Sequence, residues 1–162
     1  MRDSDEKKPG FRRAGDEEEL GFWSKEAQGR HTPFSPFQGK KITVRAQIAP
    51  NNQVEDMVVR GNIDDVMRMH IRFAFQSVKR AYEGNGLGQF FVHNKVIVSI
   101  PPLVTRRTGP SASAAAALAI LSLTTGRPVQ PGVCITGKVT TTGLIRKIGQ
   151  LKEKASAAAR AI

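Results

Sequence analysis

Two residues of this chain carry side chains that could act together as a nucleophile and a base. Ser111 stands in the run Thr108-Gly109-Pro110-Ser111-Ala112-Ser113, before an alanine-rich segment, and Lys154 stands in a second such segment. A serine hydroxyl is a weak nucleophile at neutral pH, and a lysine can activate it when desolvation lowers the lysine pKa. Pro110 suits the first turn of a helix, so we expect Ser111 among unpaired backbone N–H groups that could bind an oxyanion.

Both residues also have a purely structural interpretation. Serine often caps helices, and a lysine beside an apolar helix face often extends its charge into solvent. On a helix that starts near Leu151, we expect the apolar residues on one face to be buried: Leu151, Ala155, Ala158 and Ile162. Lys154 flanks this face and Lys152 does not, so the spacing favours Lys154 as the base and leaves both interpretations open.

The residues around this pair occur in ordered blocks: Gly109-Pro110-Ser111-Ala112, Leu123 to Val129, Thr136-Gly137, Gly143, and Ile148 to Lys154. Together these blocks resemble the proteolytic domain of Lon, the ATP-dependent serine protease. Met57 to Met67 is similar to the Lon segment before its first long helix, so the resemblance covers residues 42–162. It implies that Ser111 is the nucleophile, that Lys154 is the base, and that the Thr136 hydroxyl holds the lysine amine. A threonine that satisfies the backbone is an equally open interpretation of Thr136.

The resemblance implies an α+β fold with a mixed sheet and packed helices. It also implies hydrolysis of peptide bonds in unfolded or damaged proteins, as in protein quality control, by a homo-oligomeric ring that an ATPase feeds. The chain lacks the phosphate-binding pattern Gly-x-x-x-x-Gly-Lys-[Ser/Thr], so we expect no cofactor in it. ATP and Mg²⁺ would act only through an ATPase in another chain or in a missing part of the gene product.

Four positions depart from the Lon pattern. Thr108 and Lys138 replace acidic residues, and Ser113 and Gln150 replace glycines. Loss of two acids makes the site more positive, which by itself favours a neutral Lys154. Lon also continues past its lysine helix, whereas this chain stops at Ile162, so we expect a domain that is incomplete at its C-terminal end.

The charge of the chain suggests a different class of function. The 162 residues include 25 Lys and Arg against 14 Asp and Glu, and residues 1–20 hold five of the basic against seven of the acidic residues. The basic surplus therefore lies in residues 21–162 and would attract polyanions such as RNA. The alternative function is a catalytically degenerate domain that serves as a basic structural or binding subunit of a larger assembly, a ribonucleoprotein included. Its candidate contacts lie on one predicted helix: Arg68, Arg72, Lys79 and Arg80.

The pattern along the chain predicts a flexible charged tail over residues 1–20 and one domain over residues 21–162. Alternation predicts a strand at Lys41 to Ile48, paired with Val54 to Val59. A helix is expected from Asp64 or Asp65 to Tyr82, with a buried stripe of Val66, Met69, Phe73, Val78 and Tyr82. The remaining elements are a strand that starts at Gly21, a loop at Thr32 to Gly39, strands at Lys95 to Ile100 and Val133 to Thr136, a helix at Ala114 to Leu123 and a turn at Thr140 to Gly143.

Other classes of site are disfavoured. Cys134 is the single cysteine, which excludes an intrachain disulfide. His31, His70 and His93 lack the spacing of a metal site or a Ser-His-Asp triad, so we expect no metal. No apolar run approaches a membrane span and no targeting signal stands at the N-terminus, so we expect no membrane contact. The expected compartment is intracellular, either the mitochondrial matrix or the cytoplasm.

Overall fold

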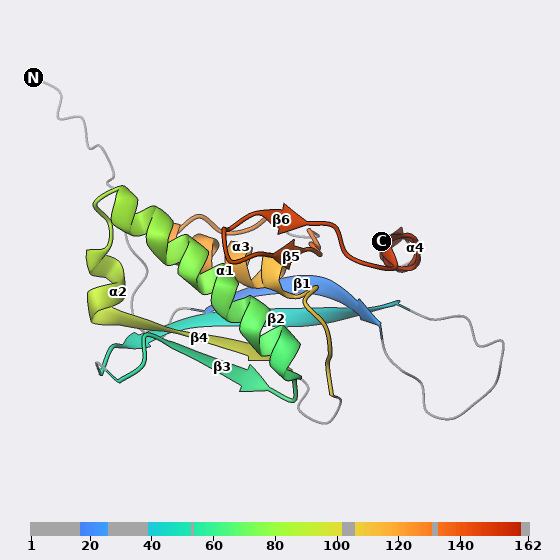
Figure 1. Ribbon diagram of the computed structural model, residues 1–162, viewed down its shortest axis with the longest axis horizontal. Coiled ribbons are helices and arrows are strands. Elements are labelled where there is room, and N and C mark those ends of the chain that lie inside the picture. Colours follow the sequence, from blue (N-terminus) through green and yellow to red (C-terminus); the bar gives the residue numbers. More distant parts are fainter. Residues whose placement is uncertain (1–16, 26–38, 53, 102–105, 131–132, 160–162) are drawn as a thin grey trace, which may run out of the picture.

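The segment after Gly39, in which apolar and polar residues alternate, is the long central strand of a sheet. In the computed structural model, which describes residues 17–25, 39–52, 54–101, 106–130 and 133–159, this strand is β2 (Gly39–Pro50) (Figure 1). Its buried residues alternate along the strand: Ile42, Val44, Ala46 and Ile48. Such a strand has one face against the core and one face toward solvent.

The sheet is mixed and has four strands in the order β1-β2-β4-β3. β1 (Glu17–Lys25) and β4 (Asn94–Ile100) flank β2 and run antiparallel to it, and β3 (Met57–Gly61) runs parallel to β4. The α+β class with a mixed sheet and packed helices is therefore confirmed. The predicted pairing of β2 with Val54 to Val59 is wrong, because the chain returns from β3 through a helical crossover that inserts β4 between them.

The boundary of the predicted tail also needs correction. Glu17 to Leu20, which we assigned to the tail, begin β1 and pair with the β2 residues from Gln47 back to Val44. β1 is an edge strand of the sheet, and charged residues are common at an edge because they discourage pairing with a further strand. Residues 1–16 and the predicted loop at residues 32–38 lie outside the described residues.

Helix α1 (Asp65–Gly84) starts where the sequence predicts. Asp64 is its N-cap, and Oδ1 of Asp64 accepts the Met67 N–H at 2.8 Å. The predicted stripe is partly wrong, because Val66 and Met69 are exposed and Phe73 is half-buried. The first turn of α1 has apolar residues on more than one face, so the sequence alone does not decide which face is buried. In the structure the buried residues of α1 are the following: Met67, His70, Ile71, Ala74, Phe75, Val78 and Tyr82.

Helix α3 (Ser113–Thr125) lies with α1 over one face of the sheet (Figure 1). It contacts α1, β1 and β2, and it is buried on nearly every side. Alanine at residues 114–117 and 119 allows this close approach, because the side chain adds little width to the helix. Tyr82 of α1 donates its hydroxyl to Thr124 Oγ1 at 2.6 Å, which satisfies two polar groups inside the packed layer.

Smaller elements complete the fold. Helix α2 (Gln89–His93), which the sequence analysis missed, brings Phe91 edge-to-face against Phe75 and Tyr82. Residues Val133 to Thr136, which were predicted to form a strand, form none in the structure. The chain instead forms a hairpin of β5 (Lys138–Val139) and β6 (Ile145–Arg146). The final helix, α4 (Leu151–Ala159), contacts β2 and β1. None of the helices in the described ranges is both long and apolar enough to cross a bilayer.

Asp64 offers a test of how α1 is anchored. Asp64→Ala should lower the free energy of unfolding by about 1–2 kcal/mol, because the first turn of α1 loses its capping carboxylate. Asp64→Asn keeps one oxygen for the Met67 N–H and should lose less, although its amide nitrogen cannot accept the Gly109 N–H as the second oxygen of Asp64 does. Urea denaturation of the three proteins measures both values, and equal losses in the two variants would contradict a role for the cap.

Candidate active site

The turn that carries Ser111 immediately precedes α3. Gly109 has a φ of 88°, a left-handed conformation that favours glycine, and the Ser113 N–H donates to the Pro110 carbonyl at 3.2 Å. Helix α3 therefore begins at Ser113, two residues later than the first-turn position that we predicted for Ser111. Ala112 is the N-cap residue and has no side-chain capping bond, so the turn must be held by other contacts.

The start of α1 supplies the first of these contacts. The N–H of Arg107 donates to the Asn62 carbonyl at 2.8 Å, and the N–H of Asp64 donates to the Arg107 carbonyl at 2.9 Å. The Gly109 N–H donates to Asp64 Oδ2 at 3.2 Å, while the other oxygen of this carboxylate caps α1. One carboxylate thus ties the segment before Ser111 to the N-terminus of a long helix.

Gly137 supplies the second set of contacts. Its N–H donates to the Ser111 carbonyl at 3.2 Å, and its own carbonyl accepts the Ala114 N–H at 3.3 Å. A Cβ atom at this position would lie 3.0 Å from Cγ2 of Ile145 and 3.1 Å from Cβ of Ala114. Glycine at position 137 is therefore what allows the segment to approach the Ser111 turn so closely.

Ser113 fastens the same two segments through its side chain. Its Oγ is buried, accepts the Val139 N–H at 2.8 Å, and lies 2.8 Å from the Pro110 carbonyl and 3.2 Å from the Gly137 carbonyl, to either of which it can donate. A glycine here, as in the Lon pattern, would lack this link. The sequence analysis noted the replacement but missed its function, because the partners of the hydroxyl lie far along the chain.

Lys154 is buried in α4, with 7% of its surface exposed. The predicted buried face is wrong, because Leu151 is 57% exposed and Ala155 is also exposed. Alanine carries little information about which face of a helix is buried, and contact with the sheet turns the lysine inward instead. Burial removes the ammonium group from water and lowers the pKa of Lys154 from 10.5, which favours the neutral amine that a base requires.

Ser111 and Lys154 line one cleft of about 580 Å³. Its walls are the turn at residues 108–111, Lys138 of β5, residues 147–150, and Lys154. Figure 1 shows the chain running from β6 along this side of the molecule into α4. The two residues selected from the sequence, one on the turn before α3 and one on α4, therefore line the same space.

The surroundings of Ser111 also offer hydrogen-bond donors. Ser111 is 6% exposed, and no described residue accepts a bond from its N–H or from the N–H of Ala112. Such amides at the start of a helix are suited to an oxyanion. The Thr136 hydroxyl donates to the Ser111 carbonyl at 3.4 Å, which is the backbone-satisfying interpretation of this threonine. Its contact with the lysine amine stays a prediction.

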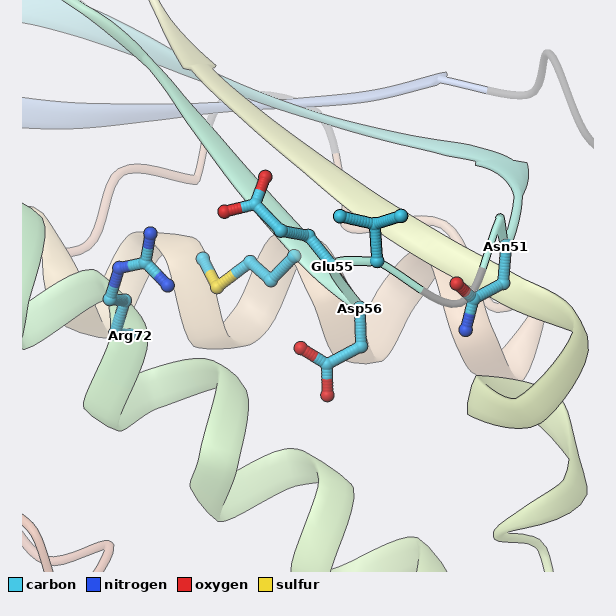
Figure 2. A pocket seen from close by; sticks show the side chains of 6 residues that line it. Asn51, Glu55, Asp56 and Arg72 are labelled. Atoms are coloured by element: carbon cyan, nitrogen blue, oxygen red, sulfur yellow. The ribbon is translucent and has the colours of Figure 1, made fainter.

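A second cleft, of about 350 Å³, lies between the β2–β3 connection and α1 (Figure 2). Figure 2 shows the carboxylates of Glu55 and Asp56 and the guanidinium group of Arg72 around it. Asp56 Oδ2 is held by Lys79 Nζ at 2.7 Å. Neither Ser111 nor Lys154 lines this cleft, so the two clefts are separate and only the first contains the predicted pair.

The basic residues of α1 have structural contacts. Arg68 Nη1 donates to the Val59 carbonyl at 2.8 Å, Arg80 Nη2 donates to the Thr141 carbonyl at 2.6 Å, and Lys79 pairs with Asp56. Arg72 lines the second cleft. Three of the four residues predicted to bind RNA therefore connect α1 to other parts of the fold: to β3, to the segment that precedes β3, and to the turn between β5 and β6. These contacts give no specific support to the alternative function as a binding subunit.

His70 has a structural contact as well. Its Nδ1 lies 2.8 Å from the Val139 carbonyl, which can only accept, so Nδ1 carries the proton and the ring anchors β5 to α1. Within the part of the chain that the structure describes, no three His, Cys, Asp or Glu side chains gather as a metal site requires.

Gln150 provides a test of local strain beside the cleft. It is the one non-glycine residue among those described with a positive φ, at 58°, and it stands where the Lon pattern has glycine. Gln150→Gly should raise the free energy of unfolding by about 0.5–1 kcal/mol, because glycine adopts this conformation without strain. Gln150→Ala keeps the strain and serves as the control in thermal unfolding. A glycine variant less stable than the parent would contradict this account.

Comparison with known proteins identifies the family. The model of the Lon protease C-terminal proteolytic domain matches residues 25–162. The Lon protease of Rhizobium meliloti (strain 1021) is 37% identical over 123 residues, which cover 75% of this chain and 15% of that protein. The Lon proteases of Brucella suis biovar 1 (strain 1330) and Erwinia amylovora are 37% and 33% identical, also over 123 residues and 75% of this chain. The chain spans 15% of the length of each of these curated relatives. The chain belongs to the family of Lon protease C-terminal proteolytic domains.

Proposed function

We propose that this chain is a serine endopeptidase domain in which Ser111 is the nucleophile and Lys154 the general base. The observation that carries the proposal is the shared cleft, in which a serine at the start of a helix and a buried lysine with a lowered pKa line one space. A neutral amine and a hydroxyl are the minimum that a serine–lysine dyad requires. The family membership of the chain supports the same reaction.

The proposed reaction has two stages. Ser111 Oγ attacks the peptide carbonyl while Lys154 Nζ accepts its proton, and the carbonyl oxygen becomes an oxyanion bound by the N–H groups of Ser111 and Ala112. The carbon–nitrogen bond then breaks, Lys154 returns the proton to the leaving amine, and an ester links the substrate to Ser111. Water, deprotonated by Lys154, attacks the ester; the bond between the carbonyl carbon and Ser111 Oγ breaks, Lys154 returns the proton to Oγ, and the second product leaves as a carboxylic acid.

Thr136 belongs to the proposal as a supporting residue. Its hydroxyl donates to the carbonyl of Ser111 and so helps to fix the turn that aims the nucleophile. The same hydroxyl oxygen can also accept an N–H of Lys154 Nζ while it donates to the Ser111 carbonyl, and we keep that second role as a prediction.

The partners of the domain are part of the same proposal. Because the chain covers 15% of its relatives, we propose that it works beside an ATPase located in another chain or in a further part of the gene product. ATP and Mg²⁺ would act there, and the peptidase domains would form a homo-oligomer that receives unfolded or damaged proteins in the mitochondrial matrix or the cytoplasm. The sequence of this chain contains no phosphate-binding loop, which is consistent with ATP hydrolysis in another chain or another part of the gene product.

Substitution of the dyad gives the direct test. Ser111→Ala and Lys154→Ala should each lower kcat for an unstructured peptide by about 10³-fold or more, because the two residues act as one unit. Lys152→Ala is the matched control, since Lys152 is exposed on the same helix and should keep most of the activity. Labelling by a fluorophosphonate at Ser111 in the parent is the second measurement. Similar losses in Lys152→Ala and Lys154→Ala would refute the assignment of the base.

The pH dependence tests the state of the lysine. Activity requires neutral Lys154, so kcat/KM should rise with pH through an apparent pKa below 10.5, the ordinary lysine value. Lys154→Arg keeps a long cationic side chain but holds its proton throughout this range, so it should be inactive at every pH. A rate profile that is flat up to pH 10, or an active arginine variant, would show that another group is the base.

A further inference from the structure

The charge of the cleft walls points to a class of substrate. Besides Lys154, two lysines line the cleft: Lys138, which is half-buried on β5, and Lys147, which is exposed in the segment after β6. None of the described lining residues carries a carboxylate. A bound peptide would therefore meet two cationic side chains and no acidic one on these walls.

Two acidic residues lie near the cleft in sequence or contact, but neither lines it. The two oxygens of Asp64 accept the N–H groups of Met67 and Gly109, so the carboxylate is bound to the backbone behind the cleft wall. Glu153 precedes Lys154 on α4, but it is exposed and does not line the cleft.

The position of Lys138 is fixed by the packing of β5. The neighbouring residue, Val139, is buried, donates its N–H to Ser113 Oγ at 2.8 Å, and accepts from His70 Nδ1 at 2.8 Å. Because both of its backbone groups are held, the strand has little freedom to turn Lys138 out of the cleft.

We propose that this cleft selects peptide segments with Asp or Glu side chains beside the scissile bond, and that Lys138 and Lys147 bind these carboxylates. The proposal rests on the proposed function, because it concerns substrates of the same site. Lys154 is not the recognition residue, since a carboxylate beside it would favour its charged form and remove the base. In this proposal Lys154 acts in catalysis as a neutral amine, and Lys138 and Lys147 bind the substrate as cations.

Cleavage of matched peptides tests the selectivity. Two quenched fluorescent peptides that differ only by Glu or Gln on both sides of the scissile bond should differ about tenfold in kcat/KM, with the Glu peptide faster. The ratio should fall toward one in Lys138→Gln and in Lys147→Gln, and further in the double variant. Lys152→Gln is the control, because Lys152 has the same charge but does not line the cleft. Since Lys147 is exposed, its variant tests the proposal even if Lys138→Gln fails to fold.

A binding measurement separates this proposal from the proposed function. Fluorescence anisotropy with the Ser111→Ala chain should show tighter binding of the Glu peptide than of the Gln peptide, and the preference should weaken between about 50 and 200 mM salt. Preferential binding of the Glu peptide, together with a parent chain that cleaves neither peptide, would support the selectivity and contradict the peptidase. Equal binding and equal cleavage of the two peptides would overturn the selectivity and leave the peptidase standing.

Discussion

The position of the Ser111 turn depends on its hydrogen bonds to residues 137–139. Ala112, the N-cap residue of helix α3, makes no side-chain capping bond, so the first turn of the helix cannot fix itself. Gly137 exchanges two backbone bonds with this turn, and the Ser113 hydroxyl adds a bond to Val139. The strand that receives these bonds is in turn anchored to α1 by His70. The two long helices and the short hairpin therefore define the location of Ser111 together, and none of them does so alone.

The burial of Lys154 has a thermodynamic consequence opposite to that of an ordinary core residue. An ammonium group taken out of water disfavours the folded state until it loses its proton. Because the folded pKa is lowered, the unfolded chain binds more protons between the folded pKa and the ordinary value, and stability rises with pH across that window. A fold selected only for stability would place an alanine or a leucine there, as it does elsewhere in the core. The buried lysine is better explained by chemistry than by packing.

The sequence predicted local structure well and packing partners poorly. Asp64 and the periodicity after it located α1, and alternation located β2, because a capping carboxylate and a strand period are properties of neighbouring residues. The Lon-like blocks selected Ser111 and Lys154, which the structure brings to one cleft. The partner of β2 and the buried face of α4 were wrong, since both depend on contacts between segments far apart in the chain. The link made by Ser113 was missed for the same reason.

In the proposed mechanism, the replacement of acidic residues near the cleft bears on substrate recognition more than on the protonation of Lys154. We expected the loss of acids at Thr108 and Lys138 to favour neutral Lys154, yet the cause of its lowered pKa is burial. If the cleft binds acidic peptides as proposed, the added charge of Lys138 acts mainly on which substrates enter the cleft. A substrate carboxylate that approached Lys154 would stabilise the ammonium form and slow the reaction. Lys138 and Lys147 can compensate such a carboxylate before it reaches the base, so a cationic wall and a neutral catalytic lysine are compatible within one cleft.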